Sequence, residues 1–369
     1  MGLFSKKGAE LGHQFSAAFK QQKYGIFFLW LRKISAAILI NLVLLPSWLL
    51  SATASLVAQD VQFFRIGTDN TGTTFFPLGG VIAAAISNPA GSRSCDQGGS
   101  CGVPGLIAVA QTTRGSIANV EAVSTLQIES GLVQSDIALW AFQGSHLFSG
   151  KAALSNLRVI ASLYQESLHI IVPTNSTIDD ISQLKGKRIS LGEKDGGSYP
   201  TALAVLGSYN LDEKDFIASH SSLRQALEEL RDGKIDAIFV VGGSPLPAIV
   251  DYTQTNSIRL LPIDGNGAAV LRQKYPFLGI EVIQEGSYRG VGNTVTIGIS
   301  TLWVTNADVP DDMVYKITRA LWITLAKKMV DANNPVVPKL RFETALNGIP
   351  IPIHPGAMKF YGELEKAKP

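Results

Sequence analysis

Several features that mark enzymes and nucleic-acid-binding proteins are missing from the sequence. Charged residues make up only 17% of the 369-residue chain, and its formal net charge is +2. A G-x-x-x-x-G-K-[ST] phosphate loop, a complete G-x-G-x-x-G after a strand and an H-E-x-x-H metal motif are all absent. The five histidines are scattered along the chain. We therefore expect no enzymatic chemistry, no cofactor and no metal site.

Positive charge is concentrated at the start of the chain, where residues 1–33 contain six Lys and Arg residues and one Glu. This local charge of +5 leaves −3 for the remainder, which excludes a basic surface for nucleic acid. Residues 34–58 are uncharged and mostly apolar. A basic region followed by an apolar run and small residues is typical of an export signal, cleaved here after Ala54 or Ala58.

The apolar run is also about long enough to span a bilayer, so an uncleaved anchor is the alternative for residues 1–58. In both cases we expect a periplasmic protein, either free or anchored to the outer face of the inner membrane. The length that remains after residue 58 suits two α/β lobes.

The two cysteines, Cys95 and Cys101, lie in a Gly- and Ser-rich stretch at residues 91–102. In an oxidising compartment this spacing predicts a local disulfide that closes a flexible loop. A metal site is the weaker alternative, because no neighbouring His completes a ligand set.

Short apolar strands alternate with helices along the rest of the chain. Four strands lead through loops of Gly, Ser and Thr into helix starts, at residues 63–67, 106–110, 188–191 and 235–241. The helix after the second strand is expected to have Ser116 as its N-cap and to end at Gly131. This alternation predicts an α/β fold with parallel layers, in which ligands bind where strand ends meet helix starts.

The loops before these helices suit small anionic or zwitterionic ligands. The first turn of a helix offers backbone N–H groups without partners and the positive end of the helix dipole. Gly lets a ligand approach the backbone, and Ser or Thr adds a hydroxyl. The same residue types are also ordinary in turns and caps, so a single loop of this kind is more often structural.

Six segments together resemble the TAXI subfamily of TRAP-type solute-binding proteins, over nearly all of residues 65–362. They are residues 66–79 (IGTDNTGTTFFPLG), Gly115-Ser116 with Asn119, 133–136, 184–190, 240–245 and 346–357 (LNGIPIPIHPGA). The resemblance implies a two-lobed type II periplasmic-binding-protein fold with a ligand cleft between the lobes and crossing hinge strands. It implies a lobe 1 of residues 59–168 plus 298–369 and a lobe 2 of residues 169–297. The crossing strands are expected at 168–173 and 294–305, and a terminal helix is expected at 311–330.

The same resemblance implies partners and ligands. Proteins of this family deliver a solute to membrane-embedded TRAP permease subunits that use an ion gradient, and their ligands are glutamate-like amino acids, dicarboxylates or keto acids. We expect a monomeric receptor for a small carboxylate-bearing solute. A receptor that reports to a membrane signalling protein is the alternative. An exported enzyme is a third possibility, for which the sequence offers no catalytic constellation.

The expected ligand-binding residues lie mainly on the loops at the helix starts. They are Thr71, Thr73, Thr74, Phe75, Arg114, Ser116, Gln134, Ser135, Asp136, His169, Gly196, Ser198, Tyr199, Gly242, Gly243 and Ser244. Arg114 is expected to supply a positive charge to a second carboxylate or else to face water. Asp69 is an alternative acceptor for an amino group. Asp136 is expected first as a helix cap, and His169 either as a structural residue or as part of the cleft lining.

Overall fold

The computed structural model describes residues 61–276, 278–327 and 337–366. The predicted export signal or anchor at residues 1–58 lies outside these described residues, as do the last residues of the helix predicted at 311–330. Within the described ranges, no helix combines the length and the apolar character needed to cross a membrane.

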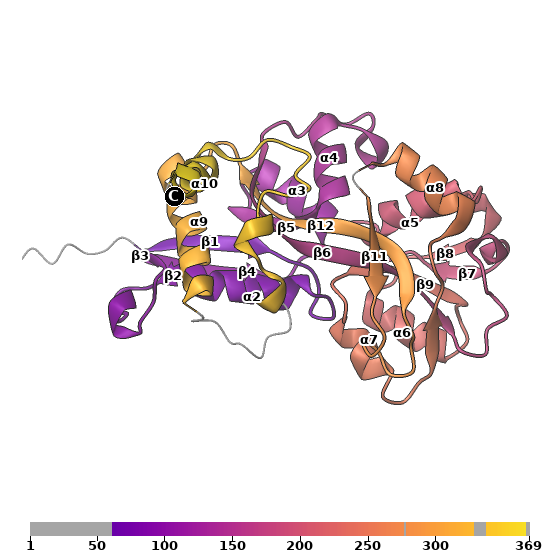
Figure 1. The fold of residues 1–369 in the computed structure, drawn as a ribbon. Coiled ribbons are helices and arrows are strands. Elements are labelled where there is room, and N and C mark those ends of the chain that lie inside the picture. The colour runs from indigo at the N-terminus through magenta and orange to yellow at the C-terminus, as the bar shows by residue number, and fades with distance from the viewer. Residues whose placement is uncertain (1–60, 277, 328–336, 367–369) are drawn as a thin grey trace, which may run out of the picture. The chain divides into compact units, whose positions relative to one another are not determined.

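A ten-stranded mixed sheet forms the centre of the described chain (Figure 1). Its strands follow the order β4 (Leu106–Gln111), β1 (Gln62–Gly67), β5 (Ser130–Gln134), β12 (Thr294–Asn306), β6 (Leu157–Pro173), β9 (Ala237–Gly242), β7 (Arg188–Ser190) and β8 (Ile217–Ser219). Two strands pair off this path, β10 (Ile258–Leu260) with β6 and β11 (Gly279–Ile283) with β12. A separate short sheet joins β2 (Ser87–Asn88) and β3 (Val103–Pro104).

The main sheet has two parallel parts joined by two long strands. β1 pairs parallel with β4 and β5, in what we call the β1 half (residues 61–156). β7 pairs parallel with β8 and β9, in the β9 half (residues 174–293). The crossing strands β6 and β12 pair antiparallel with each other, and they also pair with β9 and β5, respectively. The predicted α/β fold with crossing strands, of the type II periplasmic-binding-protein class, is confirmed, although β6 is much longer than the strand predicted at 168–173.

Helices cover the sheet on both sides of the crossing strands (Figure 1). The α-helices are α2 (Phe75–Ile86), α3 (Ser116–Ser124), α4 (Ser135–Gln143), α5 (Ser198–Ser208), α6 (Leu223–Arg231), α7 (Pro247–Tyr252), α8 (Gly265–Lys274), α9 (Asp311–Ala326) and α10 (Pro355–Lys366). The 3-10 helices are η2 (Cys95–Gln97), η3 (His146–Phe148), η4 (Ile181–Leu184), η5 (Glu213–Asp215), η6 (Val337–Lys339) and η7 (Phe342–Thr344). One apolar core contains buried residues of α2, α9 and α10, and another contains buried residues of α3, α4, α5 and α8. The second core joins the two halves, because α3 and α4 belong to one and α5 and α8 to the other.

Both sequence expectations about the ends of α3 are wrong. Gly115 is the N-cap in place of Ser116, because its φ of 98° suits glycine. The Ser116 hydroxyl instead accepts the backbone N–H of Gln134 at 3.1 Å. The helix ends at Ser124, well before residue 131, since Leu126 turns the chain with a φ of 57°.

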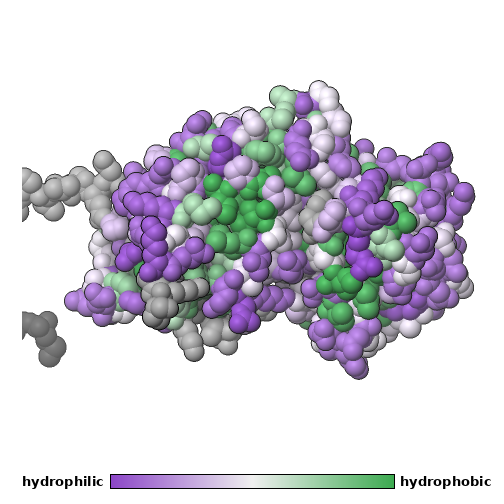
Figure 2. All heavy atoms as spheres, turned by 45° about the horizontal axis from the view of Figure 1, so that its top comes forward, coloured by the Kyte–Doolittle hydropathy of each residue, from purple (hydrophilic) through white to green (hydrophobic). Residues whose placement is uncertain are grey.

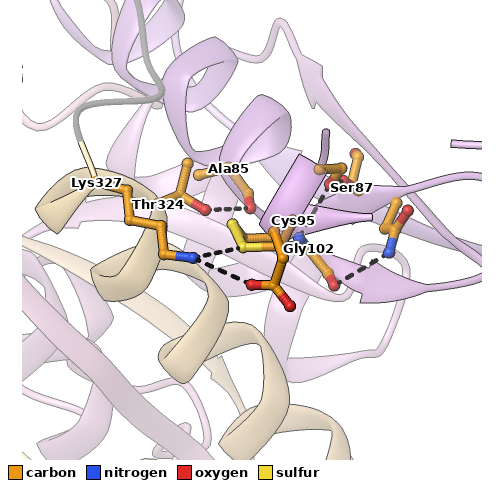
Figure 3. Close-up of a disulfide and its surroundings, with 10 residues drawn as sticks. Ala85, Ser87, Cys95, Gly102, Thr324 and Lys327 are labelled. Atoms are coloured by element: carbon orange, nitrogen blue, oxygen red, sulfur yellow. Dashed lines mark hydrogen bonds and ion pairs between the residues drawn. A yellow bond between two sulfur atoms is a disulfide. The ribbon is translucent and has the colours of Figure 1, made fainter. Parts of the chain in front are cut away.

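A disulfide joins Cys95 and Cys101 at an S–S distance of 1.93 Å (Figure 3). The ammonium group of Lys327, one residue beyond α9, donates to the Cys95 sulfur at 3.0 Å. The hydroxyl of Ser100 donates to the backbone carbonyl of Ser87. The loop is therefore held against the ends of both α2 and α9.

The surface drawn in Figure 2 is mostly hydrophilic, and its hydrophobic side chains gather in patches. Exposed large apolar side chains occur in both halves, among them Phe63 on β1 and Ile217 on β8. None of the exposed apolar residues in the described ranges lines the polar cavity described next.

Candidate functional site

A small cavity lies where loops of the two halves meet at the ends of their strands. The β1 half lines it with the loops before α2 and α3 and with the end of β5. The β9 half adds the loop before α5, the ends of β7 and β9, and the start of α6. The cavity holds about 40 Å³. A pocket for a drug-sized ligand usually measures roughly 300 Å³ or more, so this cavity is small for a whole solute.

The predicted ligand-binding residues divide into two groups around this cavity. Those that line it are Thr73, Phe75, Arg114, Ser116, Gln134, Gly196 and Ser198. Those that do not are Thr71, Thr74, Ser135, Asp136, His169, Tyr199, Gly242, Gly243 and Ser244. Several residues of the second group make hydrogen bonds that surround the site.

Hydrogen bonds across the rim of the cavity join the two halves. The backbone N–H of Ala118, in the first turn of α3, donates to the carbonyl of Asp195 at 3.1 Å. The exposed guanidinium of Arg114 forms an ion pair with the carboxylate of the same Asp195. Asn70 donates its side-chain amide to Glu193 at 3.3 Å. The loop before α5 is thereby fixed to both loops of the β1 half.

Asp69 is a half-buried carboxylate in the loop between β1 and α2. Its Oδ1 accepts the backbone N–H of Asn70 at 2.7 Å and the Asn70 side-chain amide at 3.1 Å. Burial raises the pKa of Asp69 to about 7, and the nearby charge of Glu193 adds to this rise. A carboxyl group with this pKa changes its ionisation readily near neutral pH when a charged ligand approaches.

Glu166 extends into the cavity from the crossing strand β6. It is only 1% exposed, and its Oε2 has no hydrogen-bond partner in the described part of the chain. Burial raises the pKa of Glu166 to about 8, and the charges of Asp69 and Asp136 raise it further. A hydrogen bond from Gln134 partly offsets this rise.

The side chain of Gln134, at the end of β5, lies between Glu166 and the loop before α5. Its Oε1 is buried and has no hydrogen-bond partner among the described residues. A Cβ atom added to Gly197 would lie 1.7 Å from this oxygen, so only glycine allows the approach.

Two serines of the β9 half complete the polar lining. The Ser198 hydroxyl accepts the backbone N–H of Val241 at 3.0 Å, which fixes the first residue of α5 against the end of β9. Ser190, the last residue of β7, is fully buried, and its hydroxyl has no hydrogen-bond partner in the described ranges.

Asp136 lies behind the cavity lining, in the first turn of α4. Its Oδ1 accepts the backbone N–H of Ile137 at 2.8 Å, and its Oδ2 accepts the hydroxyl of Thr201 on α5 at 2.7 Å. Burial raises the pKa of Asp136 to about 6. The residue therefore connects a helix of each half, and its neighbour Ser135 is the buried first residue of α4.

His169 is a fully buried residue of β6 that the structure places away from the cavity lining. Its Nδ1 lies 2.9 Å from the carbonyl of Ser167, and its Nε2 lies 2.8 Å from the hydroxyl of Tyr288. Burial lowers the pKa of His169 to about 4, so the imidazole is neutral at pH 7. A neutral ring that donates from Nδ1 accepts the Tyr288 hydroxyl at Nε2.

The remaining predicted residues have contacts outside the cavity. Thr71 is exposed at the surface. The hydroxyl of Tyr199 donates to Glu213 at 2.8 Å. Gly242 is the last residue of β9, and the carbonyl of Ser244 accepts the ammonium group of Lys339.

Sequence reasoning missed Glu166, Ser190 and Glu193, which all line the cavity. In the sequence, Glu166 could have been noticed as the single acidic residue of a strand that is otherwise mostly apolar. Nothing in the sequence distinguishes Ser190, because a serine at a strand end is ordinary.

One family model and several solved structures match the chain. The model of the NMT1-like family matches residues 66–364. The alkanesulfonate-binding protein SsuA from Xanthomonas axonopodis pv. citri, bound to MOPS, is 17% identical, with 76% of this chain and 83% of that chain covered and a TM-score of 0.44. The arginine-, lysine-, histidine-binding protein ArtJ from Geobacillus stearothermophilus is 10% identical, with coverages of 77% and 98% and a TM-score of 0.44. PhnD1 from Prochlorococcus marinus, in complex with methylphosphonate, is 13% identical, with coverages of 71% and 83% and a TM-score of 0.43.

Proposed function

The chain belongs to the NMT1-like family, and from the geometry of its cavity we propose that it is a receptor for a small polar solute. The observation that carries the proposal is the convergence of loops from both halves on one polar cavity. Hydrogen bonds such as Asn70 to Glu193 join the halves at its rim. In this proposal the halves separate to admit the solute and close over it by bending at the crossing strands.

The receptor works outside the inner membrane and delivers its solute to the membrane-embedded permease of a TRAP transporter, as a member of the TAXI subfamily. The basic and apolar leader at residues 1–58 supports export. The six segments that resemble TAXI proteins support the transporter class, and they include the loop at 66–79 that borders the cavity.

The solute carries a carboxylate, and it is a glutamate-like amino acid, a dicarboxylate or a keto acid. The start of α5 supports this choice, because Gly196, Gly197 and Ser198 all line the cavity. The first turn of a helix has backbone N–H groups free to donate, and its dipole favours an anion. The two glycines leave the backbone open to a ligand.

The test of the receptor function is thermal unfolding of the protein with amino acids, dicarboxylates and keto acids, each added separately. A solute at a hundred times its Kd should stabilise the folded state by about 2.7 kcal/mol. Native mass spectrometry of protein isolated from the periplasm would identify any solute that it retains. The proposal is wrong if no compound raises the unfolding temperature and no solute co-purifies.

The transporter class is tested separately, by uptake of the identified solute into cells that express the gene. Uptake should stop when an ionophore removes the ion gradient and should continue when only ATP is depleted. The reverse result would contradict the TRAP assignment and leave the receptor function standing.

A further inference from the structure

Three buried polar atoms at the cavity have no hydrogen-bond partner in the part of the chain that the structure describes. They are Oε2 of Glu166, Oε1 of Gln134 and Oγ of Ser190. Each of these residues is at most 3% exposed. Nearly all buried polar groups in folded proteins are hydrogen-bonded, so three such atoms at one cavity indicate a site that a ligand completes.

The three atoms share one chemical character, because each can accept a hydrogen bond. The oxygen of an ionised carboxylate only accepts, and so does an amide oxygen. The side-chain amide of Gln134 donates to Glu166, which leaves its oxygen directed toward the backbone of Gly197. The Ser190 hydroxyl can accept as well as donate. When Glu166 is ionised, a ligand group that satisfies all three must therefore be a donor.

The cavity is lined in part by acids, which attract a cation once they are ionised. The carboxyl groups of Glu166 and Asp69 both line the cavity, and neither forms an ion pair with a Lys, Arg or His in the described ranges. Arg114 also lines the cavity, but its side chain is 70% exposed and is paired with Asp195.

We infer that Glu166, Gln134 and Ser190 bind a protonated primary amino group of the solute. An ammonium group has three N–H donors and no acceptor, which matches three acceptors on residues that line one cavity. Its bond to an ionised carboxylate is charge-assisted and correspondingly strong. The inference rests on the proposed receptor function and narrows its solute to an amine-bearing molecule. It selects amino acids over dicarboxylates and keto acids.

Binding of an ammonium group is coupled to the ionisation of Glu166. The titratable groups that face Glu166 are Asp69, Asp136, Tyr164 and Lys339. Among them Lys339 supplies the only positive charge within the described residues, and its ammonium donates to the Ser244 carbonyl. With a pKa of about 8, Glu166 is largely protonated at pH 7. A bound cation favours its ionised form, so binding at pH 7 should release a proton.

Calorimetry with matched pairs of probes tests the inference. The probes are the twenty standard amino acids and the acids that lack only the α-amino group, such as L-glutamate with glutarate and L-alanine with propionate. The full chain should bind the best amino acid at least tenfold more tightly than its deaminated partner. Titration at pH 7 in two buffers of different ionisation enthalpy should show proton release on binding of the amino acid.

Two variants and a control test whether Glu166 and Ser190 cause the preference for the amino acid over its deaminated partner. Glu166→Gln keeps the shape of the side chain and should weaken amino acid binding at least tenfold, with little effect on the deaminated probe. Ser190→Ala should weaken it about threefold and serves as a second variant if Glu166→Gln does not fold. Glu228→Gln is the matched control, because Glu228 is exposed on α6 and does not line the cavity.

Different failures separate the inference from the proposed function. If the deaminated probe binds as tightly as the amino acid, or if both variants retain full affinity for the amino acid, the ammonium subsite is wrong and the receptor function stands. If no probe of either kind binds the unmodified chain, the proposed carboxylate receptor is overturned together with the subsite.

Discussion

The hydroxyl of Thr74 accepts a hydrogen bond from the backbone N–H of Gly243 at 3.0 Å. Thr74 precedes α2 in the β1 half, whereas Gly243 follows β9 in the β9 half. The hydroxyl of Tyr164, on the crossing strand β6, lies 2.7 Å from the same oxygen. One buried threonine therefore connects both halves to the strand that joins them.

The substitution Thr74→Val removes this connection with little change in volume. It leaves the Gly243 N–H and the Tyr164 hydroxyl buried without their partner, which should lower the free energy of unfolding by about 1–3 kcal/mol. Urea unfolding measures the change. Thr71→Val, at an exposed position of the same loop, is the control and should stay within about 0.5 kcal/mol of the unmodified protein. Equal effects of the two substitutions would contradict a structural role for Thr74.

The disulfide between Cys95 and Cys101 should contribute to stability but not to binding. Its two cysteines are six residues apart, and closing so short a loop in the unfolded chain gives about 2 kcal/mol. Replacing both by Ser should lower the free energy of unfolding by about this amount. Solute affinity should not change, because neither cysteine lines the cavity. A loss of affinity measured by calorimetry below the unfolding transition would contradict this separation of roles.

Much of the sheet could be predicted from the pattern of apolar residues alone. The four strands predicted before Gly-, Ser- and Thr-rich loops are present as β1, β4, β7 and β9. A buried parallel strand needs a short apolar run, and such a run is visible in the sequence. The end of α3 could not be predicted in this way, because it depends on a positive φ at Leu126, a residue type that rarely adopts one.

The candidate site was less accessible to sequence reasoning than the fold. Thr73 and Thr74 are neighbours of the same type, but one lines the cavity and the other turns toward Gly243. The two side chains differ because β9, a strand of the other half, ends where the N–H of Gly243 can reach the hydroxyl of Thr74. Glu166 reaches the cavity only because β6 crosses between the halves. Segments that are distant in the sequence meet here only in the tertiary structure, and the local pattern of apolar residues does not predict such contacts.

The substitution Gly197→Ala tests whether the backbone before α5 forms part of the binding site. The added Cβ would lie 1.7 Å from Oε1 of Gln134, so the side chain or the loop must shift. Solute affinity, measured by calorimetry, should fall at least tenfold, which corresponds to about 1.4 kcal/mol.

Gly207→Ala is the matched control for this substitution. Gly207 lies near the end of α5, and a Cβ there meets no atom within 4 Å. Alanine should leave solute affinity unchanged and should stabilise the helix by about 0.5–1 kcal/mol. If both glycine substitutions leave affinity unchanged, the loop before α5 is not part of the site.

Glu166 should make the stability of the unliganded protein depend on pH. Burial raises its pKa from 4.5 to about 8, so between these values the folded chain binds more protons than the unfolded chain. Stability must then fall as pH rises through this window, by up to about 1.4 kcal/mol per pH unit for each such group. Asp69, with its pKa raised to about 7, adds to the fall below pH 7.

The substitution Glu166→Gln removes one of these titrating groups and should flatten the dependence. Urea unfolding of the unmodified protein and the variant between pH 5 and pH 8.5 measures the difference. The variant should be about equally stable at pH 5 and more stable at pH 8, because the cost of ionising a buried carboxyl is absent. If the stability of the two proteins changes with pH in the same way across this range, the pKa of Glu166 is not raised by burial. That result would also count against its role in binding an ammonium group.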